Sequence, residues 1–193
     1  NLVAQLLTGT TNVEQSLQRL QRGHAEYNGF NVLFSDGERL AVFESVPGRG
    51  RVLAAGVYGM SNHLLDTPWP KVLRLKQALH QALDADDSQL LTARLLSALD
   101  DRTVAPDEAL PPTGIGIERE RWLSPSFIAS PDGRYGTRCS TVLVGERATS
   151  GWRLTLTERS FDATGLATQE RVAVLDEWPH RSTRASISES RLI

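Results

Sequence analysis

The residues best suited to chemistry are concentrated in one loop, residues 58–71, which holds Ser61, Asn62, His63 and Asp66 between two structured runs. A side-chain amide such as Asn62 donates hydrogen bonds, and a hydroxyl both donates and accepts them. Ser, His and Asp also suggest a nucleophilic triad, but members this close in sequence rarely reach one another. We therefore do not favour a triad, and the loop offers Asn62 as a hydrogen-bond donor. The alternative for Asn62 is a turn residue in the left-handed conformation.

A second candidate segment is Tyr-Gly-Thr-Arg-Cys-Ser-Thr-Val at residues 135–142, a glycine turn leading into a strand. Side chains alternate along a strand, so Arg138 points away from its neighbour Cys139. Arg138 is a permanent cation with five donors, and its structural alternative is a buried arginine that binds loop carbonyls or a carboxylate. A nucleophilic thiol needs a nearby base or a lowered pKa. Since no base is evident, we expect Cys139 to be a small buried side chain.

Composition bounds the classes of function. The 193 residues are 40% hydrophobic and 23% charged, as in a soluble domain with a sizeable core. A net charge of −2 gives no electrostatic reason to expect nucleic acid. No apolar run approaches the roughly 20 residues that span a bilayer. The single cysteine excludes an internal disulfide and favours a reducing, cytoplasmic location. Four histidines without ligand spacing predict no metal site, and no cofactor is predicted.

Segments with the hydrophobic periodicity of a helix alternate along the chain with segments that have the period-two pattern of a strand. Thr11 and Glu14 have the spacing of a capping box, and Asp36-Gly37 is a hairpin signal. This order predicts an α+β protein with mostly antiparallel sheet over residues 1–179, followed by a polar, frayed tail at 180–193. Helices are expected over residues 2–7, 12–22, 71–83, 88–99 and 117–123, and strands over 30–34, 40–43, 51–55, 137–144, 152–159 and 169–176.

Three separated motifs resemble one known family, transport and Golgi organisation 2, which is also named for an Asn-Arg-Asp-Glu motif. They are Tyr-Gly-Met-Ser-Asn-His-Leu-Leu-Asp-Thr-Pro-Trp-Pro-Lys at 58–71, Tyr-Gly-Thr-Arg-Cys-Ser-Thr at 135–141 and Glu-Arg-Ser-Phe-Asp at 158–162. Asn-Gly-Phe-Asn at 28–31 and Asp-Arg-Thr at 101–103 fit the same pattern. The resemblance covers roughly residues 1–176.

The family resembles N-terminal-nucleophile hydrolases that cleave carbon–nitrogen amide bonds with an N-terminal cysteine. The implied fold is a four-layer αββα sandwich with two antiparallel sheets. By motif match, Asn62 becomes the oxyanion-hole donor and Arg138 the arginine beside the nucleophile. Ser61, His63, Tyr135 and Thr137 would bind substrate.

The chain departs from that pattern at its start. It opens on Asn1, its only methionine is Met60, and no signal peptide is recognisable. The resemblance implies that the cysteine and the Asn-Arg-Asp-Glu motif lie upstream of Asn1. We therefore expect the later two-thirds of a domain, which would need the missing segment, in the same chain or another, to be active.

Two other functions stay open beside a hydrolase of amide bonds in a small-molecule substrate. One is a non-enzymatic binding or trafficking role for lipid, acyl-CoA or haem, which the resemblance also implies. The other is a purely structural role for the polar cluster around Asn62.

Overall fold

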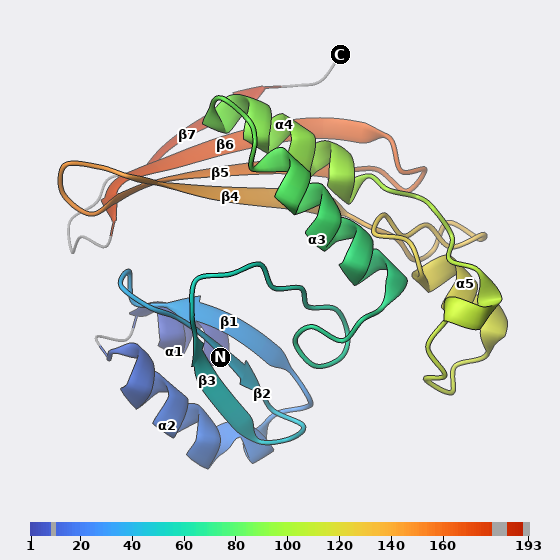
Figure 1. The fold of residues 1–193 in the computed structure, drawn as a ribbon, viewed down its shortest axis with the longest axis horizontal. Coiled ribbons are helices and arrows are strands. Elements are labelled where there is room, and N and C mark those ends of the chain that lie inside the picture. The colour runs from blue at the N-terminus through green and yellow to red at the C-terminus, as the bar shows by residue number, and fades with distance from the viewer. Residues whose placement is uncertain (9–10, 179–184, 191–193) are drawn as a thin grey trace. The chain divides into compact units, whose positions relative to one another are not determined.

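The computed structural model describes the backbone of residues 1–8, 11–178 and 185–190, and the side chains of residues 1–8 and 11–178. The chain divides into two compact units, Asn1–Gly56 and Val57–Ile193 (Figure 1). Each unit combines helices with an antiparallel sheet. The predicted α+β class is therefore confirmed, while the four-layer αββα arrangement and the single domain over 1–179 stay predictions.

The first unit places a three-stranded sheet, of order β1-β2-β3, beside helix α2. The central strand β2 is buried at three consecutive apolar positions, Ala41, Val42 and Phe43, rather than at alternate ones, and α2 buries Val13 and Leu20. The core of this unit is Val13, Leu20, Ala41, Val42, Phe43 and Leu53. Its elements are α1 (Leu2–Thr8), α2 (Val13–Gly23), the 3-10 helix η1 (His24–Glu26), β1 (Asn31–Ser35), β2 (Leu40–Glu44) and β3 (Arg49–Leu53).

Helix α2 is capped one residue later than the sequence predicts. Asn12, not Thr11, is the N-cap, and its side chain accepts from the backbone N–H of Gln15 at 2.9 Å. The side chain of Gln15 accepts in return from the N–H of Asn12, which completes the capping box. Glu14 is instead drawn into an ion pair with Arg39, with 2.6 Å between Nη2 and Oε2. The prediction of a Thr11–Glu14 box is thus wrong by one register position.

The second unit carries a four-stranded antiparallel sheet of order β4-β5-β6-β7. Helices α3 and α4 pack on each other, and α4 packs on β4, so the pair lies over one face of that sheet (Figure 1). Val142 and Thr157 are buried on the same face, since they are direct cross-strand partners. The elements are α3 (Pro70–Ala82), α4 (Ser88–Leu99), the 3-10 helix η2 (Asp107–Ala109), α5 (Ile117–Leu123), β4 (Cys139–Arg147), β5 (Trp152–Phe161), β6 (Ala167–Trp178) and β7 (Ala185–Ser190).

Strand β7 lies inside the stretch predicted to be a frayed tail. Its backbone pairs with β6, from Leu175 opposite Ala185 to Glu170 opposite Ser190. The frayed-tail prediction is wrong for these six residues because backbone hydrogen bonds can hold an edge strand without an apolar pattern. Residues 180–184 and 191–193 of that prediction lie outside the described part of the chain. Among the described residues, no helix is long and apolar enough to cross a membrane.

Candidate functional site

The loop between β3 and α3 is closed on itself by Asp66. Its backbone N–H donates to the carbonyl of Gly59 at 2.7 Å, and its carboxylate accepts from the N–H of Gly59 at 2.9 Å. Lys76 of α3 donates to the same carboxylate oxygen at 2.7 Å. A side chain on Gly59 would approach Val72 of α3 to 2.5 Å, so only glycine allows the loop to lie this close to the helix. Asn62 is thereby held between two points fixed on α3.

Two other predicted residues of this loop, Ser61 and His63, lie near Asn62 in sequence but line neither pocket described below. The ring of His63 is exposed, and its Nδ1 lies 2.8 Å from the hydroxyl of Thr67. Its ring centre is 5.9 Å from that of Trp69. These contacts give His63 a role in ordering the end of the loop, and its substrate contact stays a prediction.

Asn62 lines a pocket of about 250 Å³ in the second unit. It is built from the loop before α3 and the first turn of that helix, the proline-rich stretch before α5, α5 itself and the segment that follows it. The lining combines apolar side chains with one amide, one amine, one carboxylate and hydroxyls, and it consists of Asn62, Trp69, Pro70, Lys71, Pro111, Thr113, Ile115, Glu120, Leu123, Ser124 and Ile128.

Lys71 is the cation of this pocket. Its Nζ donates to the carbonyl of Leu123 at 2.9 Å and lies 5.9 Å from the ring centre of Trp69. The hydrogen bond joins the first turn of α3 to the end of α5. Burial lowers the pKa of the Lys71 amine, and the negative charge of Glu120 offsets part of that shift. Lys71 is therefore a desolvated donor with protons left after its bond to Leu123.

Glu120 is the buried anion of the pocket, with 7% of its surface exposed. The backbone N–H of Thr113 donates to its Oε1 at 3.0 Å, and the hydroxyl of Thr113 donates to the same atom. The second oxygen, Oε2, has no hydrogen-bond partner among the described residues. Glu120 and Lys71 attract each other but form no direct ion pair within the described part of the chain.

Arg138, Tyr135 and Thr137 line a different and smaller pocket of about 40 Å³, also in the second unit. Thr137 shapes it, since its N–H donates to the carbonyl of Ile128 at 2.8 Å and its hydroxyl accepts from the N–H of Ile128 at 2.9 Å. A side chain on Gly136 would approach the Ile128 carbonyl to 2.9 Å. Ile128 lines both pockets, while the predicted donor Asn62 and the predicted cation Arg138 each line only one of them.

Two expectations for this strand are wrong. Arg138 is exposed, so it is not a buried arginine, and its guanidinium makes no ion pair or hydrogen bond among the described residues. Cys139 is also exposed. For Cys139 the reason is the alternation along β4, since Ser140 and Val142 are buried on one face and Cys139 lies on the other, whereas Arg138 precedes the strand, which begins at Cys139.

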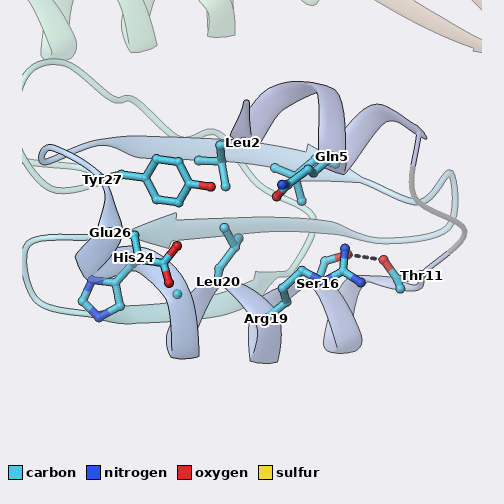
Figure 2. A pocket seen from close by; sticks show the side chains of 11 residues that line it. Leu2, Gln5, Thr11, Ser16, Arg19, Leu20, His24, Glu26 and Tyr27 are labelled. Carbon is cyan, nitrogen blue, oxygen red and sulfur yellow. Dashed lines mark hydrogen bonds between the residues drawn. The ribbon is translucent and has the colours of Figure 1, made fainter.

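The first unit has a separate pocket of about 170 Å³ that the sequence analysis did not foresee. Figure 2 shows Leu20 of α2 directed toward Leu2 of α1, flanked by Tyr27 and Gln5. Ser16, buried on α2, is bonded to the hydroxyl of Thr11 at 2.9 Å. Both apolar and polar residues line this pocket, and none of them belongs to the predicted site.

Comparison with known proteins decides the family. The family model described as transport and Golgi organisation 2 matches residues 1–163. The chain belongs to this family. Among curated proteins, the Bos taurus transport and Golgi organization protein 2 homolog is 35% identical over 83% of this chain and 60% of its own length. The Mus musculus and Homo sapiens homologs are 27% and 28% identical, with the same coverage. The chain thus spans about 60% of the length of these members of the transport and Golgi organisation 2 family.

Sequence reasoning missed Lys71 and Glu120. Lys71 carries a weak signal, because it directly follows the Pro-Trp-Pro of the loop and so must lie in the first turn of α3. Glu120 carries none, since it is one of several charges on a short helix and is buried only because Thr113 folds back onto it. Among the described residues, no group of three or more His, Cys, Asp or Glu side chains could hold a metal ion.

Proposed function

We propose that this chain supplies the substrate pocket of a hydrolase that acts on carbon–nitrogen amide bonds. The observation that carries the proposal is that Asn62, an exposed residue, lines the same pocket as a second donor, Lys71, among mostly apolar side chains. Hydrogen-bond donors directed at a carbonyl oxygen stabilise the negative charge that develops on it during acyl transfer. Apolar walls formed by Trp69, Leu123 and Ile128 suit the hydrocarbon part of an acylated amine.

In this mechanism the substrate carbonyl points at Asn62. Arg138, which lines a different pocket, stabilises charge near the attacking group only if that group lies between the two pockets. The family resemblance implies that the full-length protein supplies that group as a cysteine thiol. Attack forms the carbon–sulfur bond and releases the amine, and water then releases the acid. Asn62 contributes only if its amide N–H lies where the oxyanion forms.

The test is turnover of acylated amines by the full-length protein. Replacing Asn62 with Ala should lower kcat by roughly 10²–10³-fold, the usual cost of one lost oxyanion donor. Gln77→Ala is the control, since Gln77 carries an exposed side-chain amide on α3 and does not line the Asn62 pocket. Equal turnover after replacement of the N-terminal cysteine, or a kcat unchanged by Asn62→Ala, would refute the proposal.

A second candidate is a binding or trafficking protein that uses the pocket without cleavage. The observation that favours it is that Asn62 and Arg138 line different pockets in this chain. Thermal stabilisation of the full-length protein by haem or an acyl-CoA compound, without turnover, would support this role. A melting temperature that neither compound changes would count against it.

A further inference from the structure

We propose that Lys71 and Glu120 form an amide-recognition pair, which selects ligands that carry a secondary amide over ligands that carry an ester. The inference rests on the proposed function in one respect: it takes the pocket around Asn62 as the ligand site. It goes further by naming the two residues that read the ligand and the group that they read.

The charges of the pocket indicate a neutral ligand group. Lys71 and Glu120 line the same pocket with opposite charges, so neither a carboxylate nor an ammonium could contact both favourably. A carboxylate would meet Glu120, and an ammonium would meet Lys71. A neutral group that offers an acceptor to the amine and a donor to the carboxylate satisfies both.

The hydrogen bonds that Lys71 and Glu120 can still form also suit a neutral group with one acceptor and one donor. Lys71 uses one bond for the carbonyl of Leu123, which leaves protons to donate. Glu120 uses Oε1 for Thr113, which leaves Oε2 to accept. Among the described residues Ser126 Oγ is the only fully buried side-chain polar atom without a partner, so Oε2 of Glu120 must still contact solvent, and a ligand N–H can reach it in place of water.

A secondary amide has this pattern of groups. Its C=O accepts from Lys71 and Asn62, and its N–H donates to Oε2 of Glu120. An ester of the same size keeps the carbonyl but replaces the N–H with an oxygen, which would face the carboxylate oxygen without a proton between them. Sites built to bond a ligand N–H reject the analogue that lacks it, because their buried polar groups are then left unpaired.

The pocket also limits the size of the ligand. Its volume of about 250 Å³ is just below the 300–1,000 Å³ of pockets that enclose drug-sized molecules. Trp69, Leu123 and Ile128 provide apolar walls for short hydrocarbon groups. A longer acyl chain would extend out of the pocket, so selectivity should depend on the amide and its nearest carbons.

The test compares two probes of equal length, N-butylhexanamide and butyl hexanoate, by NMR titration of the full-length protein. We expect the amide to bind roughly 10- to 100-fold more tightly, the usual range for one hydrogen bond to a charged group. Glu120→Gln should cancel or reverse this ratio, because Thr113 holds the side-chain oxygen and turns the new NH₂ group toward the ligand. Glu118→Gln, on the exposed surface of α5, is the matched control and should leave the ratio unchanged.

An equal loss of affinity for both probes in Glu120→Gln would overturn the proposal, since it would show a merely structural role for the carboxylate. If this variant does not fold, the proposal is tested by the affinity of the wild-type protein for N-butyl-N-methylhexanamide, which lacks the N–H. Wild-type affinities for amide, N-methyl amide and ester within twofold of one another would also overturn it. Turnover is measured in parallel, so that selective binding without cleavage refutes the proposed hydrolase and leaves the recognition pair intact.

Discussion

Replacing Asp101 with Asn should destabilise the second unit, because Asp101 joins three segments of it. Its carboxylate accepts from Nε of Arg74 on α3 at 2.7 Å and from the N–H of Thr103 at 2.9 Å. Its backbone carbonyl accepts from the N–H of Phe127 at 2.9 Å. Asparagine keeps the size of the side chain and an acceptor for Thr103, but it removes the charge that pairs with Arg74.

The expected loss of stability follows from the exposure of this ion pair. Hydrogen bonds to charged groups contribute roughly 1.5–3 kcal/mol when buried, and exposed ion pairs contribute about 0–1 kcal/mol. The side chains of Arg74 and Asp101 are 32% and 24% exposed, so the pair lies between these limits. We expect Asp101→Asn to lower the free energy of unfolding by about 1–2 kcal/mol near pH 7.

The effect should depend on pH. Burial works to raise the pKa of Asp101, but the hydrogen bonds from Thr103 and Arg74 outweigh it and lower the pKa below its ordinary value. A carboxylate with a lowered folded-state pKa stabilises the protein above its unfolded-state pKa, about 3.9, and loses that contribution as the pH falls through the folded-state pKa. The stability difference between wild type and Asp101→Asn should therefore shrink below about pH 4.

Urea denaturation followed by tryptophan fluorescence between pH 7 and pH 2.5 measures both quantities. Asp100→Asn is the matched control, since its partner Arg102 is 49% exposed and Asp100 itself 50%. The control should cost less than about 0.5 kcal/mol. A cost for Asp101→Asn equal to that of the control, or a difference that stays constant down to pH 2.5, would refute the reasoning.

Three further outcomes are expected. Phe127→Ala should lower the free energy of unfolding by about 3–5 kcal/mol in urea titrations, because this side chain is 2% exposed and packs edge-on against Phe161 at 4.8 Å; a loss below 1 kcal/mol would contradict this. Gly136→Ala should reduce the melting temperature measured by calorimetry, because the added carbon would lie 2.9 Å from the carbonyl of Ile128; an unchanged value would mean that the neighbouring backbone yields freely. Lys71→Met should have a higher free energy of unfolding than the wild type near pH 7. This advantage should diminish toward pH 10, because the buried amine of the wild type loses its charge there. An advantage that grows with pH would contradict the lowered pKa of Lys71.

Most of the secondary structure follows from local patterns. Helix α5 occupies Ile117–Leu123 as predicted, and α4 spans Ser88–Leu99 as predicted, with Asp87 capping it. The boundaries fail where tertiary contacts decide. Strand β4 continues past Gly145 to Arg147, because Arg147 pairs with Trp152 of β5 and its guanidinium lies 4.4 Å from that ring. A prediction from neighbouring residues in the sequence cannot take account of a pairing partner on another strand.

The candidate site follows from the sequence only in part. The loop around Asn62 is visible because its polar residues stand between two structured runs, and the resemblance singled out Asn62 and Arg138. Glu120 could not be predicted, because its burial depends on Thr113, seven positions earlier, folding back onto it. That Asn62 and Arg138 line different pockets could not be predicted either, because it depends on how distant segments fold together, such as Ile128 and Thr137, which are joined by hydrogen bonds.

The closed loop at Asp66 has a thermodynamic consequence for any ligand of Asn62. Ordering one residue of a flexible backbone costs roughly 1–2 kcal/mol of conformational entropy. If the segment from Gly59 to Asp66 were free, a ligand would have to order it, and that cost would cancel most of the affinity of a small molecule. Because the bonds between Gly59, Asp66 and Lys76 already order the segment, this cost is met when the protein folds. A ligand then meets a loop backbone that is already ordered, and a small ligand with few contacts can still bind.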